Sequence, residues 1–253
     1  LVSCIGLVAL SGLLPQIATA TGKLLQVGTL SALSAGVYDG STTLGPIQRP
    51  DAYGLGTFDR LDGEMIVMSG VIFRVGSDGR VTKPVNTTTI PFAAISQLDT
   101  PDASADVTAT TGRAAFEKLV MEKLQSANYP ALVVFDGKFS AVRTRSVPAQ
   151  QKPYPTLAEV CSTQQKEFDL GPQEGTLVGF FCPQWMAGIN APGMHLHFLN
   201  SDHSAGGHVL DFTIESGVLR IQTLTGVQVL LPGVDSAYAE SDIAPTSAGS
   251  AEK

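Results

Sequence analysis

The sequence predicts an α+β fold built from two β-rich lobes of mainly antiparallel strands with few helices. Between residues 54 and 75, short runs of β-branched and aromatic residues alternate with turn dipeptides such as Asp62-Gly63 and Ser69-Gly70, which is typical of a β-meander. Similar runs return between residues 175 and 223. Only residues 112–127 show a clear helical repeat of apolar against charged side chains, so we expect helices to be few.

The composition indicates a folded chain and argues against nucleic acid as a partner. Hydrophobic residues make up 43% of the 253 residues and charged residues 15%, which is typical of a protein with a sizeable buried core rather than a disordered one. The formal net charge of −7 repels a phosphate backbone, and the aromatic side chains are few and scattered. We therefore expect no nucleic-acid partner.

The N-terminal segment has the pattern of a secretory leader. Residues 1–17 are almost wholly apolar and uncharged, and residues 18–20 follow the small-x-small pattern of a cleavage site. This pattern predicts a signal peptide over residues 1–20 and a secreted protein. The alternative is a buried N-terminal helix or strand, and a protein that keeps its leader would be cytoplasmic. The apolar run is short for a membrane span, so we expect no membrane partner after cleavage.

Residues 21–150 form the predicted N-terminal lobe. It opens with a short apolar stretch at residues 24–27, and another apolar run begins at residue 91. Its expected strands lie at residues 56–58, 64–68 and 71–75 and, after the helix at 112–127, at residues 131–135 and 139–147. The dipeptide Asp136-Gly137 predicts a turn between the last two strands. The proline-rich stretch 148–155 marks the expected boundary between the lobes.

Residues 151–235 form the predicted C-terminal lobe, which carries the histidines. A short helix is expected at residues 157–160. Strands are expected at residues 175–181, 194–199, 208–214 and 218–223. The last segment, residues 236–253, is rich in Ala, Ser, Asp and Glu, which predicts a loosely packed tail.

Two cysteines remain if the leader is removed, namely Cys161 and Cys182. An even number of cysteines in an oxidising compartment is compatible with a disulfide between them. Two buried thiols are an equally good interpretation, because the sequence does not supply the Cα separation that a disulfide needs.

The histidines predict a metal site. All four lie between residues 195 and 208. His195 and His197 stand two apart in a strand pattern, so their side chains share one face, and His208 follows a glycine-containing loop that would fold it back across from the pair. Three converging imidazoles match a catalytic zinc site with an open position, although imidazole also binds iron, nickel, copper and manganese. His203 lies in the polar loop, and we expect it to be solvated.

The same histidine spacing also fits a cupin-like barrel, which would make the protein a metal-dependent oxygenase. The cupin motif adds a glutamate soon after its His-x-His pair. Ser201 and Asp202 stand where that glutamate would be expected, and this departure counts against the cupin interpretation. A non-catalytic secreted metal-binding protein is a further alternative.

Several segments, taken together, resemble the α-acetolactate decarboxylase family. The first is DAYGLGTFDRLDGEM at residues 51–65, and the second is RTRSVP at residues 143–148 with KPYP at residues 152–155. The third block combines GTLVGF at residues 175–180, PGMHLHF at residues 192–198 and GGHVLD at residues 206–211. The likeness runs in order from about residue 24 to about residue 231, which makes it far more specific than the histidines alone.

The resemblance implies a zinc enzyme that converts 2-acetolactate into acetoin and carbon dioxide, so the expected partner is a small 2-hydroxy-3-keto acid. By motif, the zinc ligands are His195, His197 and His208, and the catalytic residues are Glu64 and Arg145. The family also places a glutamate from its C-terminal tail at the metal. Glu252 is the nearest candidate here, but the tail departs from the family pattern, and the fourth ligand stays open. A homodimer is also expected.

The chemistry explains these residue types. Zinc acts as a Lewis acid on a hydroxy-ketone, the guanidinium of Arg145 would neutralise negative charge, and Glu64 would deliver a proton. Taken without the family, Glu64 could be an exposed residue beside a turn and Arg145 a surface charge. Asp211 could orient a ligand imidazole, although strand alternation places it on the face opposite His208.

Overall fold

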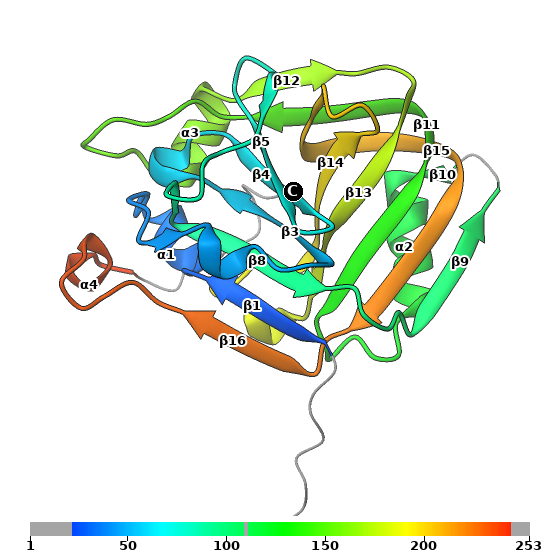
Figure 1. The fold of residues 1–253 in the computed structure, drawn as a ribbon, viewed down its shortest axis with the longest axis horizontal. Helices are drawn as coiled ribbons and strands as arrows, with labels where there is room; N and C mark the ends of the chain where they lie inside the picture. Colours follow the sequence, from blue (N-terminus) through cyan, green and yellow to red (C-terminus); the bar gives the residue numbers. More distant parts are fainter. Residues whose placement is uncertain (1–21, 109–110, 244–253) are drawn as a thin grey trace, which may run out of the picture.

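The computed structural model describes residues 22–108 and 111–243. The predicted signal peptide at residues 1–20 and Glu252 lie outside the described residues. Two large sheets dominate the fold, and their strands are antiparallel except for one parallel pair. The predicted α+β class with mainly antiparallel strands and few helices is therefore confirmed. Figure 1 shows the first sheet, mostly in blue to cyan with the orange strand β16 at its edge, beside the second sheet in green to orange.

The first sheet has the strand order β16-β1-β8-β3-β4-β5-β6. Its strands are β1 (Lys23–Val27), β3 (Ala52–Thr57), β4 (Glu64–Met68), β5 (Val71–Val75), β6 (Val81–Thr82), β8 (Phe92–Gln97) and β16 (Gly226–Leu230). A small separate sheet pairs β2 (Thr42–Thr43) with β7 (Thr89–Ile90). The meander expected between residues 54 and 75 is present as β3, β4 and β5, which pair in sequence order.

The second sheet closes on itself, because β11 pairs with β13, β13 with β14, β14 with β15, and β15 again with β11. Its strands are β9 (Ala103–Val107), β10 (Thr111–Gly112), β11 (Ala131–Ser146), β12 (Lys166–Asp169), β13 (Gln173–Cys182), β14 (Gly193–Asn200) and β15 (Gly206–Thr223). The sheets do not follow the predicted division of the chain near residue 150. The strand β11 precedes that point but belongs to the second sheet, and β16 returns to pair with β1 of the first.

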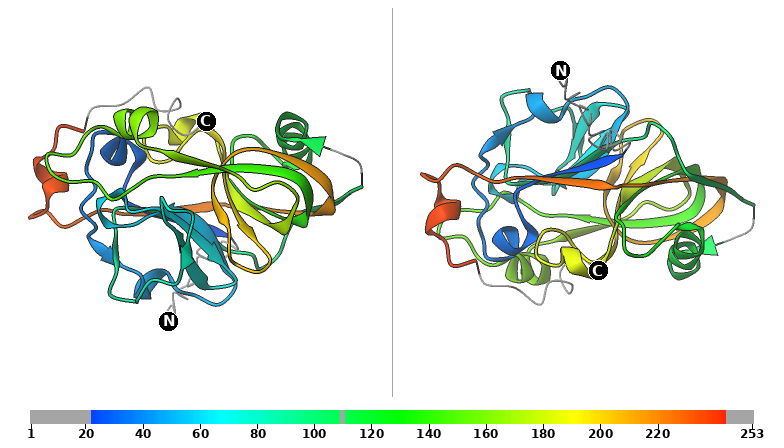
Figure 2. Two further views of the ribbon diagram at one scale, coloured as in Figure 1. Left: turned by 90° about the horizontal axis from the view of Figure 1, so that it is seen from above. Right: turned by 90° about the horizontal axis from the view of Figure 1, so that it is seen from below.

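Short helices lie around the two sheets. They are α1 (Leu30–Ser34), α2 (Arg113–Lys123), α3 (Leu157–Thr163) and α4 (Ala237–Glu240), with 3₁₀ turns η1 (Gly45–Ile47), η2 (Asp59–Leu61) and η3 (Gln184–Met186). The expected helix at residues 112–127 is present as α2 but is shorter, and the expected helix from residue 157 is α3. Figure 2 shows α2 and α4 at opposite ends of the molecule. None of the described helices is long and apolar enough to cross a bilayer.

The two sheets pack against each other through a shared apolar core. Alternate side chains of β11 point to opposite faces, as a strand requires. Leu132 and Val134 join Leu55 and Ile66 of the first sheet in the core between the sheets. Val133 and the other face of β11 belong to a second core beneath α2. The face of the second sheet that meets the first sheet is the face that carries the site.

The predicted turn at Asp136-Gly137 is wrong, because β11 runs unbroken from Ala131 to Ser146. Gly137 pairs with Gly175 on one neighbouring strand and Gly217 on the other. A Cβ at Gly137 would lie 2.3 Å from the carbonyl oxygen of Ser216, so glycine here permits close strand approach rather than a reversal. For the same reason β15 passes through Gly217 and joins the two strands expected at 208–214 and 218–223.

The cysteines form no disulfide with each other. Cys182 is a buried free thiol on β13, and Cys161 lies on α3. Burial raises the pKa of the Cys182 thiol to about 12. The sequence allowed either a disulfide or buried thiols, and Cys182 is a buried thiol.

Candidate metal centre and active site

Strand pairing brings the three predicted metal ligands together. His195 and His197 lie on β14, and His208 lies directly opposite His197 on β15. Leu196 and Phe198, which alternate with them, point into the core beneath α2. The two histidines of β14 therefore face the first sheet, on the side expected from their spacing.

The three imidazoles form a compact buried group. Their ring centroids lie 4.9–5.3 Å apart, and one potential ligand atom from each ring lies within 4.8 Å of the others. The Nε2 of His195 is 3.2 Å from the Nδ1 of His208. All three side chains are almost completely buried. Such a cluster of nitrogen donors without a competing solvent shell suits a divalent transition metal.

The electrostatics keep these imidazoles neutral, as metal ligation requires. Burial, with the nearby charges of Arg145 and Arg113, lowers the pKa of His195 to about 3. Burial also lowers the pKa values of His197 and His208 well below the usual range, and neighbouring positive charge adds to the effect. A neutral imidazole has one nitrogen lone pair available, so the donor set fits a metal ion.

His197 is oriented by the first sheet. Its Nδ1 lies 2.9 Å from the carbonyl oxygen of Met65 on β4. Because a carbonyl only accepts, the ring must donate from Nδ1, and the lone pair lies on Nε2, which faces the site. The contact with Met65 thus selects the tautomer of His197 and holds its ring in place, as carbonyl partners do at many metal sites.

Glu64 reaches the same group from the first sheet. It is the first residue of β4, is 8% exposed, and its Oε2 lies 3.5 Å from the Nε2 of His197. The alternative of an exposed residue beside a turn is therefore wrong. The strand β4 begins at Glu64, and the packing of the two sheets against each other points its side chain at the histidines.

Arg145 lies beside the histidines on the neighbouring strand. It pairs directly with His208 in the β11–β15 register, so Arg145, His208 and His197 follow one another across three strands. Its side chain is 4% exposed, which excludes the surface-charge alternative. Arg143, by contrast, pairs with Asp211 at the molecular surface and lies outside the cluster.

An irregularity in β11 decides which face carries Arg145. Val133 and Phe139 point into the core beneath α2, and so does Val142, although strict alternation would place Val142 on the other face. The register shift between Phe139 and Ala141 leaves Ser140 as an extra residue. Such a bulge reverses the side-chain alternation beyond it, so Arg145 faces the histidines.

A pocket connects these groups. Its polar lining comprises Thr57, Glu64, Arg145, Cys161, His195 and His208, and its apolar lining comprises Leu33, Leu61, Phe92, Val147 and Leu157, with Gly56. The apolar side chains exclude water from one side of the pocket. A small polar molecule with an alkyl portion could therefore contact the metal ligands and the arginine together.

Two other residues considered from the sequence lie outside the cluster. His203 occupies an exposed turn, where its ring packs against Phe73, as expected for a loop histidine. Asp211 is exposed, and its Oδ1 accepts a hydrogen bond from the backbone N–H of Phe212. The suggestion that Asp211 orients a ligand imidazole is therefore wrong.

Cys161 is one of the pocket residues that the sequence patterns did not single out for the site. It lies four residues after Leu157 in α3, and both line the pocket. Residues four apart share a helix face, so the buried apolar face of α3 was the signal that could have found it.

Comparison with known proteins shows which family the chain belongs to. Residues 24–245 match the family model described as alpha-acetolactate decarboxylase. The chain belongs to the alpha-acetolactate decarboxylase family. The alpha-acetolactate decarboxylase of Methylococcus capsulatus is 38% identical over 222 residues, which cover 88% of this chain and 84% of that protein. The Bacillus subtilis alpha-acetolactate decarboxylase is 37% identical over 210 residues, which cover 83% and 82%.

Solved structures show the same fold. The crystal structure of alpha-acetolactate decarboxylase from Bacillus subtilis strain 168 superposes with a TM-score of 0.82 at 35% identity, and covers 87% of this chain and 93% of that one. Membership of this family makes the protein a carboxy-lyase rather than a cupin-like oxygenase.

Proposed function

We propose that this protein converts 2-acetolactate into acetoin and carbon dioxide, with a zinc ion held by His195, His197 and His208. The observation that carries the proposal is a cluster of three buried imidazoles, two of which line one pocket together with Glu64 and Arg145. The substrate follows from the name that the similar proteins carry. Zinc is favoured because three imidazoles with an open position are typical of catalytic zinc.

The reaction needs charge stabilisation and one proton. Acetolactate loses carbon dioxide when the bond between the carboxylate and the hydroxyl-bearing carbon breaks, and the electron pair of that bond moves toward the ketone oxygen. A zinc ion in the site supplies a Lewis acid that stabilises negative charge on oxygen. The hydroxyl-bearing carbon must then take up a proton to give acetoin.

Arg145 binds and orients the negatively charged end of the substrate. Its guanidinium lines the pocket beside His208 and is buried, so water screens its charge only weakly. A planar fork of donors matches a carboxylate better than an ammonium group does. Held there, the carboxylate would point away from the apolar wall, and the alkyl groups of the substrate would lie against that wall.

Glu64 is placed to handle the proton. Its carboxyl group lines the same pocket and lies beside His197, within the volume where the reacting carbon would bind. A carboxyl group in such a position protonates the carbon that has lost carbon dioxide. Thr57, directly opposite Glu64 in the β3–β4 pair, donates from Oγ1 to the carbonyl of Gly63 at 2.7 Å, which fixes the backbone from which Glu64 projects.

The proposal is tested with purified protein of known metal content and racemic 2-acetolactate. We expect acetoin to form well above the spontaneous rate, to fall to that rate after chelation, and to recover when zinc is added. Acetoin formation no faster than the background at full zinc occupancy would refute the proposed reaction. Activity that does not fall after chelation would refute the role of the metal.

A further inference from the structure

We propose that Cys161 and Gln165 position the guanidinium of Arg145, and so set the geometry of the substrate-binding arginine. The inference rests on the proposed function through the role of Arg145. The Nη1 of Arg145 donates to the Sγ of Cys161 and, at 3.1 Å, to the Oε1 of Gln165. Two acceptors on one nitrogen of a planar group define both its direction and its rotation.

The helix that carries Cys161 is itself held firmly. Thr156 caps α3, and Glu159 completes a capping box with it: the backbone N–H of Thr156 donates to Glu159 at 2.8 Å, and the N–H of Glu159 donates to Thr156 at 3.4 Å. Leu157 and Val160 are buried in the core between the sheets. A helix fixed at its cap and through its apolar face presents Cys161 from a defined position.

Gln165 is oriented by a second contact. Its Nε2 donates to the Oε1 of Glu167 at 2.9 Å. Because a carboxylate only accepts, the NH₂ end of the amide must face Glu167, and its oxygen is left to accept from Arg145. Glu167 also pairs with Arg145 in the β11–β12 register, so the three side chains lie along one edge of the sheet.

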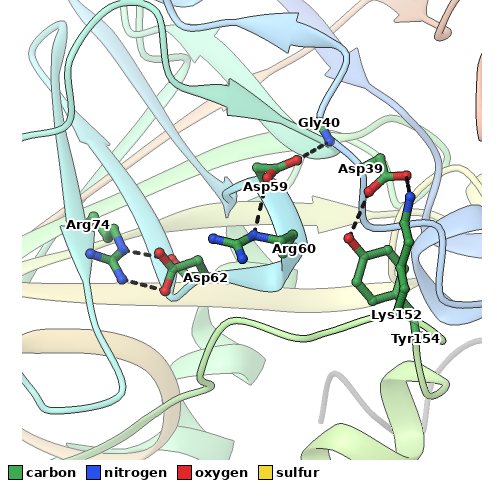
Figure 3. A network of polar contacts seen from close by, with 8 residues as sticks. All are labelled: Asp39, Gly40, Asp59, Arg60, Asp62, Arg74, Lys152 and Tyr154. Carbon is green, nitrogen blue, oxygen red and sulfur yellow. Dashed lines mark hydrogen bonds and ion pairs between the residues drawn. The ribbon is translucent and has the colours of Figure 1, made fainter.

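The segment between Arg145 and α3 is held by the loop that contains Asp39 and by the 3₁₀ turn η2. Asp39 accepts a hydrogen bond from Lys152 at 2.6 Å and from Tyr154 at 2.7 Å, which Figure 3 shows. The backbone N–H of Gln150 donates to the carbonyl of Arg60 at 2.7 Å. Both ends of the contact, the arginine on β11 and its acceptors at α3, are therefore fixed independently of the substrate.

Kinetics of single and double variants test this role. Without both acceptors, the long arginine side chain would sample several rotamers, and a displacement of about 1 Å at a reacting group costs up to roughly 10²-fold in rate. We expect Cys161→Ala combined with Gln165→Ala to lower kcat/KM on the order of 10-fold or more. Among the single variants, Cys161→Ser should keep a higher kcat/KM than Cys161→Ala, because the serine hydroxyl can accept a hydrogen bond from Arg145. Ser162→Ala, on the exposed face of α3, is the matched control.

A double-mutant cycle separates positioning from general destabilisation. In an Arg145→Lys background, the Cys161 and Gln165 substitutions should cause little further loss, because the group that they position has gone. The proposal would be overturned if the Cys161 and Gln165 substitutions lowered kcat/KM by the same factor in the Arg145→Lys background as in the wild type. It would also be overturned if they changed kcat/KM less than about twofold in the wild-type background.

Reversible thiol modification gives a second readout. Attack of the Cys161 thiolate on methyl methanethiosulfonate forms a methyl disulfide and releases methanesulfinate, and excess dithiothreitol reverses it. We expect inhibition that dithiothreitol relieves in the wild type and none in Cys161→Ser. The buried Cys182, with its pKa raised to about 12, should not compete. Equal inhibition of both proteins would count against the assignment.

A crystallographic comparison does not depend on activity. In the zinc-loaded wild type the guanidinium of Arg145 should adopt one position, and in the Cys161→Ala, Gln165→Ala variant it should move or occupy several. If the wild type made no acetoin, the proposed function would fail while this comparison still decided the inference. An arginine unmoved in the double variant would overturn it.

Discussion

A methyl group at Gly179 should push β14, the strand that carries His195 and His197, out of place. Gly179 lies on β13 opposite Leu196, between the two histidines of β14. A Cβ added there would lie 1.9 Å from the carbonyl oxygen of His195, and real Cβ atoms essentially never approach closer than 3.0 Å. The clashing atom belongs to the backbone and cannot rotate away. The strand β14 must therefore shift by about 1 Å, the difference between these two distances.

The expected magnitudes follow from that shift. Overpacking of this kind costs about 1–3 kcal/mol of stability. Metal–ligand distances tolerate only about 0.2 Å, so a 1 Å movement of His195 should weaken zinc binding by at least the 10–100-fold that outer-shell changes typically cost. Where metal is still bound, misplacement of this size should lower kcat/KM on the order of 10²-fold.

Chelator competition and denaturant unfolding measure the two effects on Gly179→Ala. Gly45→Ala is the matched control, because a Cβ at Gly45 meets no atom within 4 Å and its backbone is not left-handed. A Gly179→Ala protein with the zinc affinity and unfolding midpoint of the wild type would refute the reasoning, because the added methyl group would then fit without displacing β14.

Three further substitutions test the proposed metal ligands, the proposed proton donor Glu64, and the contact of Asp39 with Lys152 and Tyr154. His197→Ala should lose zinc and activity, and stoichiometric zinc after dialysis, measured by mass spectrometry, would reject this ligand. Glu64→Gln should keep its zinc but lower kcat on the order of 10²–10⁴-fold; an unchanged kcat would show that another group delivers the proton. Burial raises the pKa of Asp39, but the hydrogen bonds from Lys152 and Tyr154 lower it by more. The pKa of Asp39 is therefore below its usual value. A lowered carboxyl pKa contributes stability above the unfolded-state value of about 3.9, and that contribution disappears as pH falls through the lowered pKa. The Tm difference between wild type and Asp39→Asn, followed by calorimetry, should therefore narrow on acidification; a constant difference would contradict it.

Local patterns predicted the first sheet better than the second. The meander of β3, β4 and β5 depends on neighbouring runs and short turns, which are visible in sequence. The long strands β11 and β15 were expected to break at Asp136-Gly137 and near Gly217. Those glycines instead meet one another across strands that are far apart in the chain, and no local pattern records such a contact.

The histidine cluster was predicted from the sequence itself. His195 and His197 stand two apart, which places both on one face of any strand, and the glycine-containing loop before His208 permits the hairpin that returns it to them. The residue types alone then specify a nitrogen-rich metal site.

Only the tertiary structure decided what faces that site. Glu64 comes from the other sheet, and its approach depends on how the two sheets pack. Arg145 faces the histidines because the extra residue Ser140 reverses the alternation of β11, and Cys161 reaches it from a helix outside the sheet. Side-chain direction in a strand repeats every two residues, so one unpaired residue reverses it, and spacing in the sequence does not show where that residue lies.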